Sequence, residues 1–129
     1  MKALTALIVD DSSVMRKIVE RSLRQAGVEL AKVLEAGNGL EALGVLKESP
    51  VDVVFSDINM PVMDGLEFVR QMQALETARK VPVMMITTEG SESRVVEAIS
   101  LGARGYLRKP FTPEQIRQQM APLFTEAAQ

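Results

Sequence analysis

Five short strand-like runs alternate along the chain with longer segments in which apolar residues recur at helical spacing. Three of the runs are almost wholly apolar, which is typical of strands covered on both faces of a parallel sheet. Because no linker or low-complexity stretch interrupts the alternation, the pattern predicts one α/β domain with right-handed crossovers and helices on both faces. We expect the strands at Ala6 to Val9, Lys32 to Glu35, Val53 to Ser56, Val83 to Thr87 and Gly105 to Leu107.

The segments between these runs carry helix start and stop signals. The first helix is expected to end at Gly27, because glycine commonly follows the last helical turn. Asn38 to Glu41 and Asp64 to Glu67 resemble capping boxes. Thr112 before a proline is typical of the start of a helix. Because five βα units are too few for an eight-stranded barrel, an open doubly wound five-stranded sheet with five helices is predicted.

The composition excludes several kinds of chemistry. The chain has 129 residues, of which 47% are hydrophobic and 25% charged, as in an ordinary globular domain with a sizeable core. The net charge of -2, with both signs mixed along the chain, predicts no nucleic-acid or membrane-surface partner. Without cysteine or histidine there is no disulfide, thiolate or imidazole metal ligand, and no Ser-His or Cys-His pair. Acid–base chemistry would therefore fall to carboxylates or to Lys109.

No targeting or membrane-spanning segment is expected. The short apolar stretch near the N-terminus is broken by Asp10 and Asp11, unlike that of a signal peptide. No run approaches the roughly 20 apolar residues that span a bilayer. These features, with the lack of cysteine, predict a cytoplasmic protein.

Four of the expected strands end on groups that phosphoryl chemistry uses. Asp10 and Asp11 follow the first strand, Asp57 follows the third, Thr87 ends the fourth and Lys109 follows the fifth. In the flavodoxin-like strand order 2-1-3-4-5, these four strands are neighbours, and ligands bind at their carboxyl ends. That order is adopted from known folds of this class, since the residues alone do not dictate it. It would place the five side chains at one edge of the sheet.

Such a cluster suits a metal-assisted reaction between a carboxylate and a phosphoryl group. Three close carboxylates repel one another, so the pKa of at least one would rise unless a cation were bound. Oxygen ligands alone suit Mg²⁺, Mn²⁺ or Ca²⁺. Asp57 is a candidate nucleophile that would form an aspartyl phosphate. Lys109 and the metal would offset charge on the transferred oxygens, and Thr87 could donate a hydrogen bond to one of them.

Each residue also has an ordinary structural explanation when taken alone. An Asp at a strand end is more often a turn residue or a helix cap, although Ser12 or Ser13 could cap the first helix instead. Thr87 suits a strand, and Lys109 suits an exposed turn. Tyr106 could be a half-buried strand aromatic. Only the coincidence of these residues at one edge favours a functional site.

Four segments together resemble the receiver domain of bacterial two-component response regulators. The resemblance covers essentially the whole chain and is strongest to the stand-alone chemotaxis regulators of that family. It implies a single receiver domain over residues 1–129 with no output domain. It also implies a signalling protein, not an enzyme, that assists its own phosphorylation and dephosphorylation. The segments are Val9 to Ser12, Asp57 to Gly65, Ile86 to Glu89 and Gly105 to Phe111.

The resemblance implies a role for each residue near the acidic cluster. Asp57 would accept a phosphoryl group from a phosphohistidine of a sensor histidine kinase. Mg²⁺, which Mn²⁺ can replace, would be held by the carboxylates of Asp10, Asp11 and Asp57. The backbone carbonyl of Asn59 would complete the protein ligands. The side chains of Asn59 and Glu89 would tune how fast water reaches the phosphoryl group.

The resemblance further implies a switch. Thr87 would move toward the phosphoryl group, and Tyr106 would follow it inward. Lys109 would pair with the phosphate, aimed by a cis peptide bond before Pro110. The face made by the fourth helix, fifth strand and fifth helix would change and control binding of a downstream protein, such as a flagellar motor switch. A monomer is the expected state.

Other functions fit the sequence less well or stay open. Within the family, a phosphorelay intermediate and a phosphate-sink receiver remain alternatives. A haloacid-dehalogenase-like phosphohydrolase needs a second aspartate two residues after the nucleophile, where this chain has Asn59. A receiver that never turns over phosphate is disfavoured by the complete acidic set with Thr87 and Lys109. A nucleotide-binding module would need a glycine-rich motif that is absent after the first strand.

Overall fold

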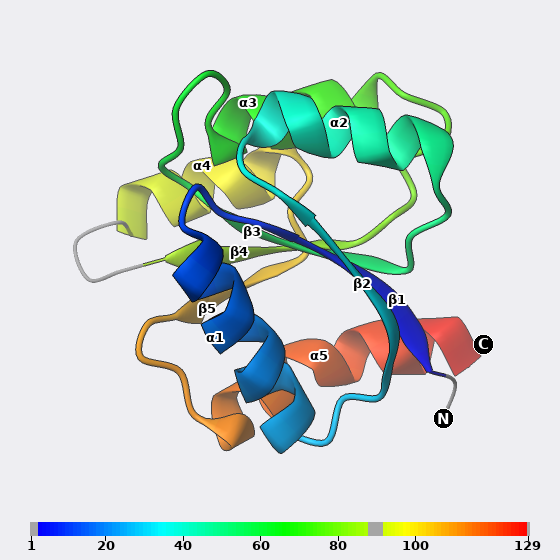
Figure 1. Ribbon diagram of the computed structural model, residues 1–129, viewed down its shortest axis with the longest axis vertical. Helices are drawn as coiled ribbons and strands as arrows, with labels where there is room; N and C mark the ends of the chain where they lie inside the picture. The colour runs from blue at the N-terminus through cyan, green and yellow to red at the C-terminus, as the bar shows by residue number, and fades with distance from the viewer. Residues whose placement is uncertain (1–2, 88–91, 129) are drawn as a thin grey trace.

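The computed structural model describes residues 3–87 and 92–128, with side chains described as far as residue 122. In that part of the chain, five parallel strands form one sheet in the order β2-β1-β3-β4-β5, which confirms the predicted open doubly wound α/β fold (Figure 1). The strands are β1 (Leu4–Val9), β2 (Leu30–Ala36), β3 (Val53–Asp57), β4 (Val83–Thr87) and β5 (Gly105–Arg108). The helices are α1 (Ser13–Gln25), α2 (Gly39–Glu48), α3 (Gly65–Gln73), α4 (Glu92–Leu101) and α5 (Pro113–Ala128).

Four of the strands are longer than the sequence pattern predicted, and only β4 has the predicted bounds. Strand β1 begins two residues early, at Leu4, because Leu4 pairs with Leu30 of β2. Strand β2 is an edge strand whose exposed residues hide its strand pattern. Asp57 is itself the last residue of β3, and Arg108 is the last residue of β5. Pairing across the sheet therefore extends four strands beyond the runs from which they were predicted.

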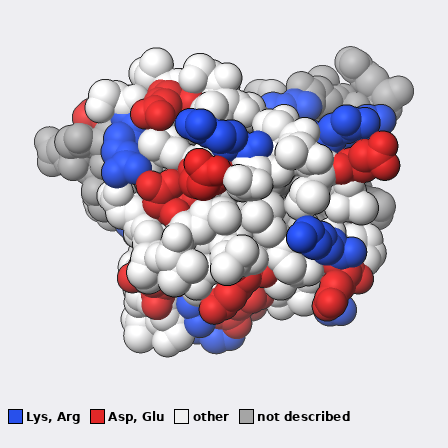
Figure 2. Space-filling model, turned by 90° about the horizontal axis from the view of Figure 1, so that it is seen from above, with Lys and Arg blue, Asp and Glu red and all other residues white. Residues whose placement is uncertain are grey.

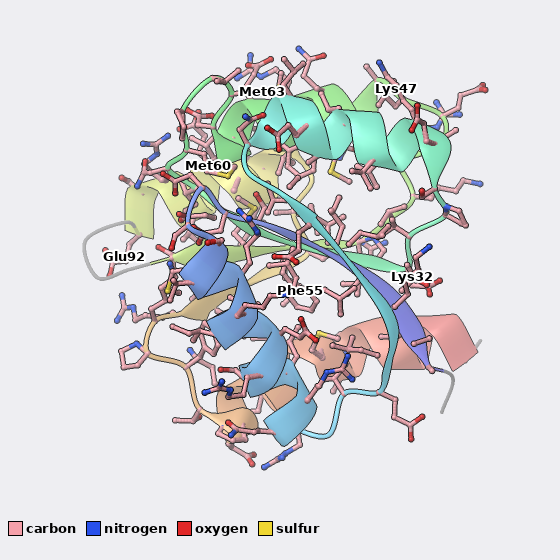
Figure 3. The ribbon with its side chains drawn as sticks, viewed as in Figure 1. Lys32, Lys47, Phe55, Met60, Met63 and Glu92 are labelled. Atoms are coloured by element: carbon pink, nitrogen blue, oxygen red, sulfur yellow. The ribbon has the colours of Figure 1, made fainter. Side chains whose placement is uncertain are left out.

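The helices form two layers, with α2, α3 and α4 on one face of the sheet and α1 and α5 on the other (Figure 1). Side chains of β1 alternate between them: Leu7 packs in the core under the first layer, and Ile8 in the core under the second. Phe68 of α3 is fully buried in the first core. Phe55 of β3, labelled in Figure 3, is fully buried in the second core with Ile116 of α5. The sheet is thus covered on both faces, as its apolar strands require.

Side-chain caps fix the starts of four helices. Ser12 Oγ accepts a hydrogen bond from the backbone N–H of Met15 at 3.2 Å, so Ser12, and not Ser13, caps α1. The other three caps are Asn38, Asp64 and Thr112, as predicted. Because a serine caps α1, neither aspartate before it is needed for that purpose.

The end of α1 also follows the sequence pattern. Gly27 has a φ of 91°, which a glycine adopts without strain, and it lies just after the last helical turn. None of the helices in residues 3–87 and 92–128 combines the length and the apolar character needed to cross a lipid bilayer.

Candidate functional site

Strands β1 and β3 bring the three predicted carboxylates together. The two strands pair in register with Val9 opposite Ser56, so the next residues, Asp10 and Asp57, emerge side by side at the carboxyl edge of the sheet. One carboxylate oxygen from each of Asp10, Asp11 and Asp57 lies within 4.8 Å of the others. Asp10 is buried, Asp57 is half-buried and Asp11 is exposed. Such a group is open on one side and can hold a divalent cation.

Asp10 is the deepest member of the cluster and is only 2% exposed. Its Oδ1 accepts a hydrogen bond from the backbone N–H of Ser12 at 2.9 Å. In the part of the chain that the structure describes, no hydrogen-bond donor contacts its Oδ2, and Lys109 Nζ lies 3.7 Å from that oxygen. A buried carboxylate oxygen so weakly compensated is unfavourable. A cation held by the three carboxylates would satisfy it, so the residues present fit a bound metal.

The electrostatic environment of Asp57 also fits a bound metal. Burial raises the pKa of the Asp57 carboxyl above its ordinary value, and the nearby Asp10 carboxylate raises it further. Lys109 opposes the rise in pKa, as do the backbone N–H groups of Ile58 and Asn59, of which Ile58 donates to Asp57 Oδ1 at 2.8 Å. A raised pKa means that the ionised form is disfavoured until more positive charge arrives. Carboxyls perturbed in this way by burial and by charge neighbours are typical of functional sites.

Strands β4 and β5 bring Thr87 and Lys109 to the same edge. Thr87 is the last residue of β4, pairs with Arg108 and is only 4% exposed. The backbone N–H of Lys109 donates to Thr87 O at 2.8 Å. The peptide bond between Lys109 and Pro110 is cis, as the resemblance implied. The five predicted side chains therefore meet at one edge of four neighbouring strands.

Asn59 has a partner that the sequence analysis did not predict. It is exposed in the loop after β3, and its Oδ1 accepts a hydrogen bond from Arg94 Nη1 of α4 at 2.7 Å. Arg94 Nη2 also contacts Asp64 Oδ2 at 3.3 Å. No local pattern signals a contact between residues 35 positions apart. Glu89, the other predicted tuning residue, lies outside the described residues.

The loop between β3 and α3 is tightly folded, and Met60 and Met63 mark it in Figure 3. Val62 has a φ of 69°, and the N–H of Met63 donates to Pro61 O at 2.7 Å. A three-residue turn with positive φ at its centre is the rarer and more strained form of the γ-turn. The same Met63 accepts a hydrogen bond at its carbonyl from the N–H of Gly39 at 3.0 Å. The strained turn is thus held against the start of α2.

Gly65 closes this loop against the strand that carries Asp57. Its N–H donates to Ile58 O at 2.7 Å. A Cβ atom at this position would lie 2.2 Å from the carbonyl oxygen of Asp57, which is far inside contact distance. Only glycine therefore lets α3 begin so close to the backbone of the acidic site.

A shallow groove of about 190 Å³ lies between α4 and β5, next to Thr87. Tyr106, which is 38% exposed, lines it, as do Arg108 and Glu92, which form an ion pair with each other. Glu92 is labelled in Figure 3. The rest of the groove is lined mostly by aliphatic side chains of α4. The lining residues are Thr87, Glu92, Val95, Val96, Ile99, Tyr106 and Arg108. Thr87 therefore touches both the edge that carries the acidic cluster and the groove that carries Tyr106.

The charges on the face formed by α2 and α3 are mixed. Figure 2 shows Lys and Arg interspersed with Asp and Glu there, with uncharged surface between them. Such a face offers no field of one sign that would attract a polyanion. This agrees with the small net charge of the chain.

The fold places this chain among the doubly wound α/β domains, and comparison with known families narrows that class. The family model of the response regulator receiver domain matches residues 6–121. The chain therefore belongs to the receiver family of two-component signal transduction, as the sequence motifs indicated.

Its relatives carry chemotaxis names. The chain is 41% identical over 115 residues to the chemotaxis protein CheY homolog of Campylobacter jejuni, covering 88% of this chain and 87% of the relative. It is 39% identical over 123 residues to the chemotaxis protein CheY-3 of Vibrio cholerae, covering 95% and 93%.

Solved structures agree with this family. The chemotaxis response regulator CheY4 of Vibrio cholerae has a TM-score of 0.79 at 38% identity, over 95% of this chain and 99% of the other. The receiver domain of a sensor histidine kinase from Pseudomonas aeruginosa has a TM-score of 0.78 at 25% identity, with coverage of 95% and 99%. That structure contains a magnesium ion coordinated in its active-site cleft.

Proposed function

We propose that Asp57 of this response regulator accepts a phosphoryl group from a phosphohistidine of a sensor histidine kinase, in chemotaxis signalling. The observation that carries the proposal is the half-buried Asp57, with its raised pKa, beside the buried Asp10 and near Lys109. The chemotaxis names of its relatives support the biological setting. The downstream partner would be a protein such as a flagellar motor switch.

The transfer requires no proton from this chain. A carboxylate oxygen of Asp57 attacks phosphorus, the P–N bond of the phosphohistidine breaks, and its electron pair returns to the imidazole, which takes up a proton from solvent. Because this chain contains no histidine, the donor imidazole belongs to another molecule. In the dephosphorylation half of the cycle, water attacks phosphorus and the P–O bond to Asp57 breaks, which releases inorganic phosphate and the free Asp57 carboxylate. Asn59 and Glu89 would tune that hydrolysis.

Asp10, Asp11 and Asp57 would hold Mg²⁺, or Mn²⁺ in its place, together with the backbone carbonyl of Asn59. When bound, the metal supplies positive charge beside the transferred phosphoryl oxygens. Two observations support this assignment: the weakly compensated Oδ2 of Asp10, and the magnesium ion in the related Pseudomonas receiver. Lys109 would offset the remaining charge, as its distance of 3.7 Å from Asp10 Oδ2 allows.

Signalling would follow from the new charge on Asp57. A phosphoryl group adds about -1.5 to -2 charges and three acceptor oxygens. Thr87 would donate its hydroxyl to one of these oxygens, and Tyr106 would move into the space that Thr87 leaves. The groove that both residues line supports this path. The face formed by α4, β5 and α5 would then bind its partner with a different affinity.

Incubation with acetyl phosphate and Mg²⁺, followed by intact mass spectrometry, tests the proposal. The wild-type protein should gain one hydroxylamine-labile phosphoryl group, and Asp57→Asn should gain none. Asp52→Asn is a matched control, because Asp52 precedes the same strand at the opposite edge, where its side chain accepts a hydrogen bond from Thr5 N–H. An equal adduct on Asp57→Asn would refute the proposal. So would the absence of both an adduct and beryllium fluoride binding on the wild-type protein.

A further inference from the structure

Arg94 of α4 joins two points of the loop that follows Asp57. Its Nη1 donates to the side-chain oxygen of Asn59 at 2.7 Å, and its Nη2 contacts Asp64 Oδ2 at 3.3 Å. Asn59 lies two residues after Asp57, and Asp64 is the N-cap of α3. One guanidinium therefore connects α4, the acidic site and the start of α3.

The hydrogen-bonding groups of Arg94, Asn59 and Asp64 determine which of their atoms can face one another. A guanidinium has only donors, so Asn59 must present its carbonyl oxygen, and not its amide nitrogen, to Arg94. Asp64 uses its two oxygens separately: Oδ1 accepts from the N–H of Glu67 as the helix cap, and Oδ2 faces Arg94. Asp64 is thereby held by α3 while it holds Arg94. A planar fork of N–H groups can reach two acceptors at once, which a lysine ammonium on its flexible stem does less well.

The segment between these two anchor points is strained. Val62 adopts a φ of 69°, a conformation that β-branched residues rarely take. Its side chain is 78% exposed, so packing of that side chain does not hold the turn. Strained backbone persists only where its surroundings impose it. Arg94 spans the segment from Asn59 to Asp64, and the Gly39 N–H holds Met63 between them.

We propose that Arg94 is a positioning residue for the metal site. It holds Asn59 in place before a cation arrives, so that less ordering of the loop remains to be done on binding. The inference rests on the proposed function in one respect, that the backbone carbonyl of Asn59 serves as a metal ligand. By linkage, cation binding at the loop stabilises α4 through the same guanidinium.

Mg²⁺ titration by calorimetry tests this role without any phosphoryl chemistry. Arg94→Lys keeps the charge but loses the fork, whereas Arg94→Gln loses both. The Kd for Mg²⁺ should rise roughly three- to tenfold in both variants, below the about ten- to hundredfold typical for groups bonded directly to a metal ligand. Arg70→Lys is the matched control, because Arg70 is 60% exposed and pairs only loosely, at 3.7 Å, with Glu67 on the same helix. Its Kd should equal that of the wild-type protein.

A further variant tests Asp64, the second residue that Arg94 contacts. Asp64→Asn keeps the helix cap, since asparagine also accepts from the N3 N–H, but it removes the ionic partner of Arg94. Its Kd for Mg²⁺ should rise as well, and the effects of Asp64→Asn and Arg94→Lys should combine non-additively in a double-mutant cycle.

Amide hydrogen exchange separates positioning from a merely structural role. Mg²⁺ should slow exchange in α4 of the wild-type protein and should do so much less in Arg94→Lys. Unchanged Mg²⁺ affinity in Arg94→Lys and Arg94→Gln would overturn the proposal, even if their urea midpoints fell. Such a result, together with an Asp57 adduct on the wild-type protein, would leave the proposed phosphoryl function standing. A raised Kd in both variants, with neither an adduct nor beryllium fluoride binding on the wild-type protein, would support the role of Arg94 and refute the phosphoryl function.

Discussion

Helices α3 and α4 lie next to each other on the same face of the sheet, yet they are anchored very differently. Helix α3 buries apolar side chains along its length, among them Phe68, Val69 and Met72. Helix α4 buries Val95 and Ala98, whereas its Val96 and Ile99 are 68% and 46% exposed. Regions with few buried apolar contacts open at lower free energy than the core. The difference assigns α3 to the fixed frame of the acidic site and α4 to the part that can respond to it.

Under the proposed function, this contrast would let a small change in charge at Asp57 have a distant effect on α4. A ligand shifts a two-state equilibrium only by its differential contacts with the two states. The acidic edge needs a support to hold its carboxylates, and α3 supplies it, because Gly65 lets the helix begin against the backbone of Asp57. A weakly anchored α4 needs few new contacts to be shifted, and Thr87 lies at the boundary between the two regions.

The largest expected effect comes from comparing one apolar residue of α3 with one apolar residue of α4. Phe68→Ala should lower the free energy of unfolding by roughly 3–5 kcal/mol, because it leaves a cavity in the first core. Val96→Ala should change it by less than about 0.5 kcal/mol, since Val96 is mostly exposed. Urea denaturation measures both. Equal losses in the two variants would break the comparison between α3 and α4.

The second prediction concerns Thr87, which joins the two regions. Thr87→Ala should still accept a phosphoryl group from acetyl phosphate, because Asp57 and the acidic cluster are intact. It should lose most of the change in α4 hydrogen exchange that beryllium fluoride induces in the wild-type protein. Thr5→Ala is the control. Thr5 lies near the amino end of β1, at the edge of the sheet opposite the acidic cluster, so this variant should respond normally. A full α4 response in Thr87→Ala would show that the signal takes another path.

The third prediction concerns the pH dependence of the acidic edge. Because the pKa of Asp57 is raised above 3.8, ionising it disfavours the folded state, and its contribution to stability falls as pH rises through the folded pKa. Without metal, Asp57→Asn should therefore be more stable than the wild-type protein at pH 7, with the difference vanishing near pH 3. Mg²⁺ at ten times its Kd should stabilise the wild-type protein by about 1.4 kcal/mol. Val96→Ala should show the wild-type pH profile, and a parallel profile for Asp57→Asn would contradict the raised pKa.

The smallest expected effect is relief of strain in the loop that leads into α3. Val62→Asn should raise the free energy of unfolding by about 1 kcal/mol, because asparagine tolerates positive φ better than valine does. Val14→Asn is the control: Val14 is 66% exposed in α1, where valine and asparagine have similar helix propensities. The urea midpoint of Val62→Asn should rise, and that of Val14→Asn should stay close to the wild-type value. A lower midpoint for Val62→Asn would mean that the turn is not strained.

Sequence reasoning succeeded where local chemistry decides the structure. Strand β4 was predicted with its bounds because each of its residues is buried and its run is apolar up to Thr87. The caps at Asn38 and Asp64 were predictable because a capping side chain bonds within its own turn. The five polar residues of the site could be brought together once a strand order was adopted, since parallel strands end at one edge.

The features that the sequence did not predict depend on contacts between segments that are far apart along the chain. The contact between Arg94 and Asn59 needs α4 to be placed over the loop after β3, which no periodicity encodes. The positive φ of Val62 contradicts the preference of valine, so tertiary contacts impose it. The bounds of β2 were too short because an edge strand with exposed residues has little pattern of its own.

The close approach at Gly65 also bears on how this protein can diverge. Any side chain there would push against the backbone carbonyl of Asp57, so that position offers no room for variation. Three residues earlier, Val62 projects into solvent and can be exchanged without touching the acidic residues. The same loop therefore combines one sterically constrained position, Gly65, with one permissive position, Val62. Substitutions can therefore accumulate at the exposed tip without disturbing the backbone of the acidic site.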